Sequence, residues 1–166
     1  MTIRDPFKML FLCTGNSARS IFGEYLIRKL GKGRFKSYSA GADPRPQVNP
    51  YALRVLQESF KIDASDARPT SWDVYEDVVF DFVITVCDHA KETCPVWPGQ
   101  PITAHWSSPD PAEFKGSDHE TYRYFWTIAH QIYRRVDLLC NLPLEKLDRL
   151  RLEYATRQIG EKEKNL

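Results

Sequence analysis

The sequence predicts a single-domain α/β protein in which a parallel β-sheet carries helices on both faces. Short apolar runs alternate along the 166 residues with longer stretches of helical periodicity. The run DFVITVC, residues 81–87, is apolar almost throughout, which is typical of a strand covered on both sides. The length suits one domain with a sizeable core, and no internal repeat divides the chain.

Four strands are expected, each bounded by turn residues. They cover residues 7–13 (FKMLFLC), 35–41 (FKSYSAG, stopping at Gly41), 81–87, and about 102–105 within a proline-rich segment.

The first two expected helices carry clear start or stop signals. The helix within residues 17–33 ends at Gly31 and Gly33. The helix over 49–60 begins with Asn49 as its cap and Pro50 at its first position.

A third, longer helix is indicated by apolar residues that recur every three or four positions. These residues are Tyr122, Phe125, Ala129, Ile132, Val136 and Leu139. Residues 1–142 are expected to form the functional domain. Residues 143–166 are expected to form a helical extension, with a further helix over 144–160 and a frayed tail over 161–166.

Composition excludes several classes of protein. The net charge is +1, so neither nucleic-acid binding nor a polybasic membrane contact is expected. No run approaches the roughly 20 apolar residues that span a bilayer. The N-terminus carries an early acid and does not resemble a signal peptide. We therefore expect a cytoplasmic protein whose four cysteines are reduced and are catalytic, metal-binding or core residues.

The stretch FLCTGNSARS, residues 11–20, predicts an anion-binding loop with a nucleophile. Cys13 ends a strand and the next residues open a helix, where backbone N–H groups and the helix dipole favour an anion. The dipole and Arg19 are expected to lower the pKa of Cys13, and the guanidinium can grip two oxygens of a tetrahedral oxyanion. Gly15 is expected to permit the tight curve, Asn16 to brace the loop and Ser20 to donate to the thiolate. The expected oxyanion-binding residues are Thr14, Gly15, Asn16, Ser17, Ala18, Arg19 and Ser20. The alternative is a small polar turn with an incidental cysteine.

Several motifs, taken in order, resemble one family. LCTGNSARS resembles the anion-binding loop of low-molecular-weight protein tyrosine phosphatases and of the arsenate reductases built on the same fold. The resemblance continues at SAGADPRPQVNP, DFVITVCDHAKETCPVWPGQPITAHW and PDPA, and so covers most of residues 7–140. It implies a three-layer α/β/α fold with a four-stranded parallel sheet in the order 2-1-3-4.

The resemblance also implies that Asp110 is a general acid, because an Asp-Pro stands at this place in the family. Taken alone, an aspartate in a proline-rich loop is more often a turn former. The phosphatases carry an aromatic residue soon after this Asp-Pro, which packs on the phosphotyrosine ring. This chain has Ala112 there and Phe114 two residues later, which favours a compact inorganic oxyanion.

Cys87 and Cys94 favour the reductase within this family. A phosphatase has no use for two further thiols, whereas reduction of arsenate takes two electrons. The resemblance implies that Cys13 attacks arsenate, that Cys87 attacks Cys13 and releases arsenite, and that Cys94 then forms a redox-active disulfide with Cys87. Thioredoxin, or glutaredoxin with glutathione, would reduce that disulfide.

Such a relay requires movement between Cys87 and Cys94. Disulfide formation needs Cα atoms within about 7 Å, whereas seven residues of helix span roughly 10 Å. The polar stretch DHAKET, residues 88–93, would therefore unwind or loop out. The alternatives are a buried small hydrophobe at Cys87 and a chance surface thiol at Cys94. Cys140 is expected to pack in the core.

Three functions remain open. The leading one is an arsenate reductase for arsenic detoxification, with phosphate or sulfate as competing anions and no cofactor. The alternatives are a tyrosine phosphatase using Cys13, Arg19 and Asp110, and a soft-metal-binding module using the three thiols.

The resemblance implies a structural potassium ion near the anion loop, for which Asn16, Glu24 and Ser39 are candidate ligands. Arg68 and Pro69 stand where further oxygen ligands would be expected, and a guanidinium there could replace the metal, so potassium binding is left open. A zinc site is not predicted from His89, His105 and His119, which are irregularly spaced.

Overall fold

The computed structural model describes residues 5–162 and contains a four-stranded parallel sheet, as predicted. Its strands are β1 (Phe7–Cys13), β2 (Phe35–Gly41), β3 (Phe82–Thr85) and β4 (Ile102–His105). The strand order is β2-β1-β3-β4, which confirms the order that the family resemblance implied. In the register, Cys13 pairs with Gly41 and Thr85 pairs with His105, so the carboxyl ends of all four strands meet at one edge.

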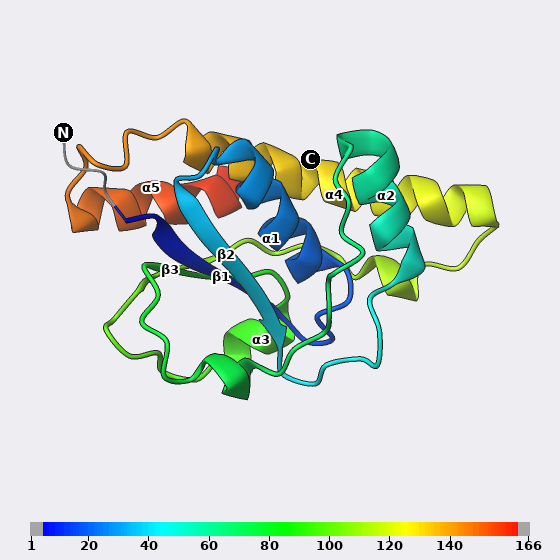
Figure 1. Cartoon of the computed structure of the whole chain (residues 1–166), viewed down its shortest axis with the longest axis horizontal. Coiled ribbons are helices and arrows are strands. Elements are labelled where there is room, and N and C mark those ends of the chain that lie inside the picture. The colour runs from blue at the N-terminus through cyan, green and yellow to red at the C-terminus, as the bar shows by residue number, and fades with distance from the viewer. Residues whose placement is uncertain (1–4, 163–166) are drawn as a thin grey trace.

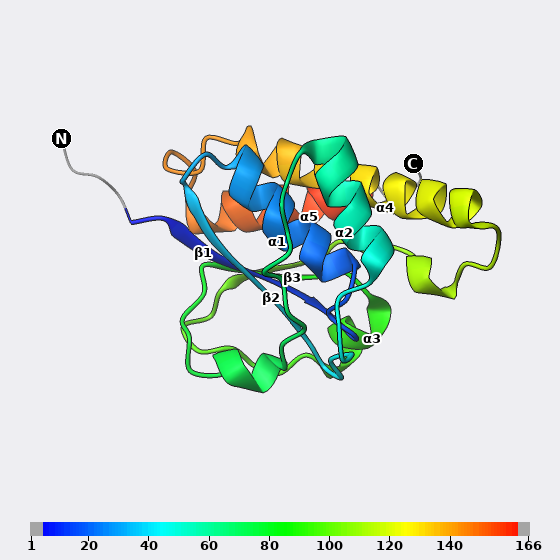
Figure 2. The ribbon, with the colours of Figure 1, turned by 45° about the vertical axis from the view of Figure 1, so that its right-hand side comes forward.

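The helices cover the two faces unequally. They are α1 (Arg19–Leu30), α2 (Pro50–Phe60), α3 (Asp88–Thr93), α4 (Asp118–Cys140) and α5 (Arg149–Lys162), with 3-10 turns η1 (Trp72–Tyr75) and η2 (Pro111–Glu113). Helices α1, α4 and α5 form a thick layer on one side of the sheet, and α2 packs outside α4. The short α3 and η1 lie on the opposite side (Figures 1 and 2).

Local sequence accounts for the starts of α2 and α4. Asn49 accepts a hydrogen bond from the Tyr51 N–H and Pro50 starts α2, as predicted. At the start of α4, Ser117 and Glu120 form a capping box. The predicted helix after Pro143 is present as α5.

Three predicted boundaries were wrong. The helix predicted over 144–160 begins five residues later, at Arg149. The strand predicted over 81–87 ends at Thr85, because the chain turns at that point and Cys87 becomes the N-cap of α3. The frayed tail was predicted to start at residue 161, but α5 continues through Lys162. Residues 163–166 lie outside the described residues.

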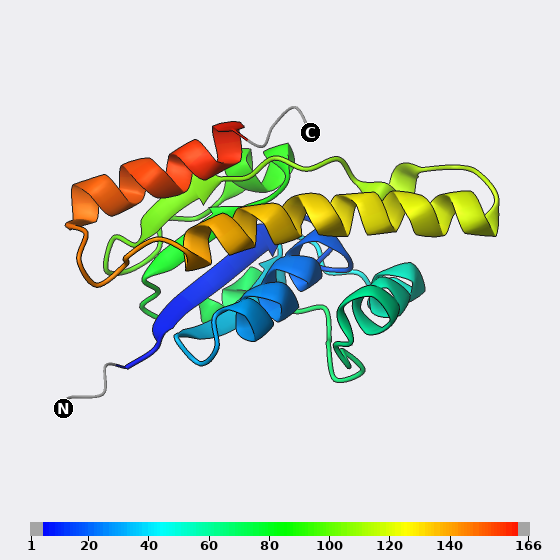
Figure 3. The same ribbon diagram turned by 90° about the horizontal axis from the view of Figure 1, so that it is seen from above.

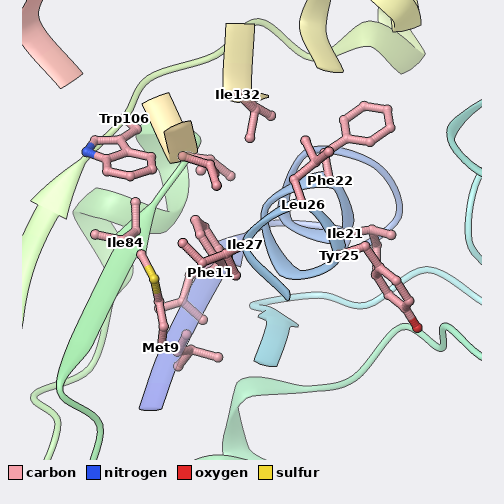
Figure 4. Packing of buried hydrophobic residues seen from close by; sticks show 14 of the residues in the cluster. Met9, Phe11, Ile21, Phe22, Tyr25, Leu26, Ile27, Ile84, Trp106 and Ile132 are labelled. Atoms are coloured by element: carbon pink, nitrogen blue, oxygen red, sulfur yellow. The ribbon is translucent and has the colours of Figure 1, made fainter. Parts of the chain in front are cut away.

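The main core lies between the sheet and the α1 and α4 helices. Figure 4 shows Phe11 and Ile84 from adjacent strands facing Ile27 of α1 and Ile132 of α4. These side chains are almost fully buried, and each contributes roughly 1.5–3 kcal/mol relative to exposure. The core therefore fixes the β1–α1 junction, where the FLCTGNSARS loop lies.

Helix α5 closes the β4 edge of the sheet. It runs alongside β4, as the view from above shows (Figure 3). Trp106, the residue after β4, is buried, and its indole N–H donates to the Thr156 carbonyl at 3.0 Å. The division at residue 142 stays a prediction. No helix of the described chain is long and apolar enough to cross a membrane.

Candidate active site

A cleft of about 920 Å³ opens at the carboxyl edge of the sheet. Its walls come from the loop after β1, the loop after β2, the start of α3 and the loop before η2. Its lining includes Cys13, Thr14, Arg19, Cys87, Ser108 and Asp110. The fold thus brings four of the five predicted catalytic residues into one cleft.

Cys13 lies at the bottom of this cleft with its sulfur held by hydrogen bonds. It is 2% exposed. The Asn16 N–H donates to its Sγ at 3.2 Å, and Ser20 Oγ lies 2.9 Å from the same atom. Asn16 Nδ2 donates to Ser20 Oγ at 2.7 Å, so the Ser20 hydroxyl proton is available for the sulfur. The predicted contact between Ser20 and Cys13 is present.

The expected lowering of the Cys13 pKa is wrong for the unliganded site. Burial disfavours the thiolate and raises the pKa above its ordinary value of 9.0. The Ser20 hydroxyl, the Arg19 charge and the Asn16 N–H lower it, but burial outweighs them. Burial thus favours the protonated thiol of Cys13 over the thiolate.

The sharp curve of the loop is made by Asn16 rather than by Gly15. Asn16 has φ 49°, a left-handed conformation that asparagine tolerates, whereas the left-handed glycines of the described chain are Gly33 and Gly99. Gly41 is needed for a different reason, since a Cβ there would lie 2.4 Å from the Thr14 carbonyl oxygen. The end of β2 can thus touch the loop.

Arg19 lies between the anion loop and the loop that carries Asp110. Its NH1 donates to the Ser108 carbonyl at 3.0 Å, and its NH2 is 3.7 Å from Asp110 Oδ2. Asp110 caps η2 by accepting from the Ala112 N–H at 3.0 Å. One carboxylate oxygen of Asp110 thus holds the turn while the other faces Arg19.

Cys87 reaches the same cleft through the start of α3. Its Sγ lies 3.3 Å from Thr14 Oγ1 and accepts from the Ala90 N–H at 3.4 Å. Thr14 directly follows Cys13, so one hydroxyl links the second thiol to the anion loop. Cys87 is buried and free, as is Cys13.

Cys94 is separated from the other two thiols by the length of α3. It follows the last residue of α3 and lines a neighbouring cavity of about 420 Å³ instead of the cleft. The Trp97 indole N–H donates to its Sγ at 3.2 Å. Burial raises the pKa of Cys94, and the Trp97 hydrogen bond opposes this. Among the described residues, all four cysteines are free.

Small and polar residues wall the cleft. Its lining includes no phenylalanine, tyrosine or tryptophan of the described chain. Phe114 instead stacks on Tyr124 of α4, with ring centroids 4.9 Å apart. No aromatic wall is available here for a phosphotyrosine ring.

Both oxygens of the Glu24 carboxylate accept hydrogen bonds from protein side chains. Ser39 donates to Glu24 Oε1 at 2.6 Å, and Arg28 donates to Oε2 at 2.8 Å. The guanidinium that meets this carboxylate is therefore Arg28. Arg68, whose guanidinium was the candidate for that place, donates to the carbonyls of Ser65 and Ala67.

No metal-binding cluster of three or more histidine, cysteine or acidic residues occurs within residues 5–162. His105 instead bridges Thr85 and Asp88, with its two ring nitrogens 2.8 Å from Thr85 Oγ1 and Asp88 Oδ1. The Asp88 pKa is lowered by this histidine. The pair ties the first turn of α3 to β4.

Sequence reasoning missed several residues of the cleft. Asp43 and Arg45 reach it from the loop after β2, and His89 from α3. The SAGADPRP motif marked that loop, but nothing in its spacing placed a side chain in the cleft. Outside the cleft lining, Arg135 of α4 was missed as well, because it stands beside the apolar stripe of a long helix.

A family model matches most of the chain. Residues 8–152 match the model of the low molecular weight phosphotyrosine protein phosphatase family. The match spans the anion loop, all three catalytic-candidate cysteines and Asp110.

Three relatives illustrate where the chain falls. An arsenate reductase of Halalkalibacterium halodurans is 35% identical over 126 residues, covering 76% of this chain and 89% of the relative. The crystal structure of an arsenate reductase from Archaeoglobus fulgidus matches with TM-score 0.65 and 30% identity, over 81% of this chain and 99% of that one. A thioredoxin-dependent arsenate reductase of Corynebacterium glutamicum matches with TM-score 0.57 and 25% identity, over 82% of this chain and 65% of that one.

Proposed function

The chain belongs to the low molecular weight phosphotyrosine protein phosphatase family, and on that premise we propose that it is an arsenate reductase that serves arsenic detoxification. The observation that carries the proposal is the position of Cys87. Its sulfur lies 3.3 Å from the hydroxyl oxygen of Thr14, the residue of the anion loop that follows Cys13. The names of the relatives support the same function, as does a cleft lining without phenylalanine, tyrosine or tryptophan of the described chain.

In the first step, Cys13 Sγ attacks the arsenic atom of an arsenate held by the loop N–H groups and the Arg19 guanidinium. A sulfur–arsenic bond forms as one arsenic–oxygen bond breaks. Asp110 protonates the departing oxygen. The proton that Cys13 loses replaces the one that Asp110 has given up. The net reaction joins thiol and arsenate and releases one water molecule.

In the second step, the Cys87 thiolate attacks the sulfur of Cys13. A disulfide forms, the sulfur–arsenic bond breaks and its electron pair stays on arsenic. Arsenic passes from the +5 to the +3 state, while two thiols are oxidised to one disulfide. Arsenite leaves after taking up protons from water.

In the third step, Cys94 attacks Cys87, frees Cys13 and leaves a Cys87–Cys94 disulfide. The two sulfurs lie at opposite ends of α3, so this helix must unwind. A dithiol protein then reduces the disulfide. The thioredoxin-dependent relative favours thioredoxin, and glutaredoxin with glutathione is the other candidate in a reducing, cytoplasmic setting.

Phosphomonoester hydrolysis is the second candidate function. It is favoured by the family model and by the grouping of Cys13, Arg19 and Asp110, which suffices for phosphate transfer to a thiol. Phosphate and sulfate are expected to compete with arsenate for the same loop. In this alternative Cys87 and Cys94 have no role in turnover.

The test is arsenate-dependent oxidation of a thioredoxin or a glutaredoxin system, run beside hydrolysis of an aryl phosphate. We expect turnover with arsenate, and its loss in Cys87→Ser and in Cys94→Ser. Cys140→Ser is the matched control, since Cys140 lies on α4 and outside the lining of the cleft. Full arsenate turnover by Cys87→Ser would refute the relay, and efficient aryl phosphate hydrolysis without arsenate-dependent oxidation would favour the phosphatase.

A further inference from the structure

Arg135 is the largest charged side chain buried in the described chain. It lies on α4 with 2% of its surface exposed. A guanidinium is costly to bury unless its donors meet acceptors. Its NH1 donates to the Ser107 carbonyl at 2.8 Å, in the loop that leads from β4 to Asp110.

Two arginines thus hold successive carbonyls of one loop. Arg19 donates to the Ser108 carbonyl from the cleft side, while Arg135 donates to the Ser107 carbonyl from α4. The Ser108 N–H also donates to the Val86 carbonyl at 3.1 Å. The Ser108 hydroxyl has no hydrogen-bond partner among residues 5–162, so this residue is held through its backbone.

The two arginines differ in what an oxyanion would do to them. Arg19 lines the cleft, and its donors turn to the ligand when an oxyanion binds in the loop. Its contacts with the Ser108 carbonyl and with Asp110 would then be shared with the ligand. Arg135 is outside the lining of the cleft, so an oxyanion in the cleft would not compete for its bond to the loop.

We propose that Arg135 is a positioning residue for the proton-transfer step, which holds the loop so that Asp110 stays within reach of the oxygen that leaves. This rests on the proposed function only in that Asp110 acts as general acid at Cys13. The same role of Asp110 is needed for arsenate and for a phosphomonoester. A planar guanidinium suits the task better than an ammonium, because its donors have a fixed direction.

The test is a double-mutant cycle between Arg135→Lys and Asp110→Asn. Arg135→Lys is expected to lower kcat about tenfold with KM nearly unchanged, because the acid is misplaced while the oxyanion loop is intact. In the Asp110→Asn background, the same substitution is expected to lower kcat less than about twofold, since no acid is left to misplace. A purely structural role would give the same loss in both backgrounds.

Two controls separate positioning from damage to the fold. Arg134→Lys changes the neighbouring, exposed arginine of α4 and is expected to behave as the parent. Combined with Ser20→Ala, which acts on the Cys13 sulfur, Arg135→Lys is expected to be additive. If Arg135→Lys fails to fold, Arg135→Met removes the buried charge and serves in the same cycle.

Losses that add in the Asp110→Asn background, or a kcat of Arg135→Lys equal to that of the parent, would overturn the inference.

The outcome of this test can be told apart from that of the proposed function. If the parent hydrolyses an aryl phosphate and leaves arsenate untouched, the reductase proposal fails and the cycle is run on the phosphate. A parent that turns over neither substrate contradicts both.

Discussion

At the scale of single residues, the direction of the hydrogen bonds around Asn16 determines whether the Cys13 sulfur receives a hydrogen bond from Ser20. The Asn16 side-chain NH₂ group donates to both Ser20 and Ser39, at 2.7 and 2.9 Å. Its oxygen accepts from the Thr70 N–H at 2.7 Å, which fixes the amide orientation. Each serine therefore has its own proton for the next acceptor, which is the Cys13 sulfur on one side and Glu24 on the other.

Ser20→Ala should therefore make Cys13 less reactive as a thiolate. A hydrogen bond to a charged group contributes about 1.5–3 kcal/mol, so its loss raises a Cys13 pKa that burial has already raised. We expect Cys13 alkylation at neutral pH to slow about tenfold or more, and its midpoint to move to higher pH. The measurement is the rate of iodoacetamide labelling, followed for the Cys13 peptide by mass spectrometry.

Ser65→Ala, at an exposed serine, is the control for that experiment and should label as the parent does. Labelling of Ser20→Ala that is as fast as in the parent would show that the Ser20 hydroxyl does not donate to the sulfur.

The residues of the cleft differ in how far the sequence reveals them. Cys13 and Arg19 were predictable, because a strand, a turn and a helix start are local signals that place both at one edge. The left-handed turn at Asn16 was wrongly assigned to Gly15, since both residue types tolerate such a turn. Arg135 was not predictable, because its acceptor lies 28 residues away in a loop that has no periodic pattern.

At the scale of elements, α3 is a short helix whose N-cap is one of the candidate catalytic cysteines. It has six residues, and a helix so short is marginal without tertiary contacts. Its N-cap is Cys87, whose sulfur accepts from the Ala90 N–H at 3.4 Å. In the proposed relay, a disulfide between Cys87 and Cys13 would remove this cap. The proposed step that calls for unwinding would thus also weaken the helix.

Hydrogen exchange should report this change. After arsenate treatment in the absence of a reductant, we expect faster amide exchange over residues 88–94, because the α3 hydrogen bonds are broken. Helix α4 should keep its protection and serves as the internal reference. Cys87→Ser forms neither disulfide, so its α3 should exchange as in the untreated parent. Unchanged protection of α3 in a protein carrying a mapped Cys87–Cys94 disulfide would contradict the unwinding.

The α/β pattern of elements was predictable because strands and helices bury faces with different periods. The fate of residues 86–93 was harder to predict. An apolar run does not indicate at which residue a strand ends and a helix begins. Here the helix begins after Cys87, whose side chain is its N-cap.

At the scale of the whole molecule, α5 completes a sheet that would otherwise end in an exposed edge. Besides the Trp106 contact, the Arg157 Nε donates to the Thr103 carbonyl of β4 at 3.0 Å. Edge strands with unpaired carbonyls invite association with other chains. The helix thereby covers β4 and holds the strand that leads into the Asp110 loop.

A matched pair of leucines on α5 tests this role. Leu152 is 6% exposed and Leu150 is 81% exposed. Leu152→Ala should lower the free energy of unfolding by about 2–4 kcal/mol through the cavity it leaves, whereas Leu150→Ala should change it by less than about 0.5 kcal/mol. Denaturant unfolding followed by circular dichroism measures both. Equal effects of the two substitutions would mean that α5 does not pack on the sheet.

The molecule as a whole separates its first two thiols from the third. Cys13 and Cys87 share the cleft, while Cys94 lines the neighbouring cavity beyond α3. The proposed relay would link these two places by passing oxidation from one thiol to the next.

The most direct test is a single turnover with arsenate in the absence of any reductant, with arsenite quantified and disulfides mapped by mass spectrometry. The account predicts about one arsenite per protein, a Cys87–Cys94 disulfide and a free Cys13, because the relay stops when its two electrons are spent. In Cys94→Ser, the disulfide should instead join Cys13 and Cys87. Arsenite production without any disulfide, or a parent that produces no arsenite while all four cysteines stay reduced, would contradict it.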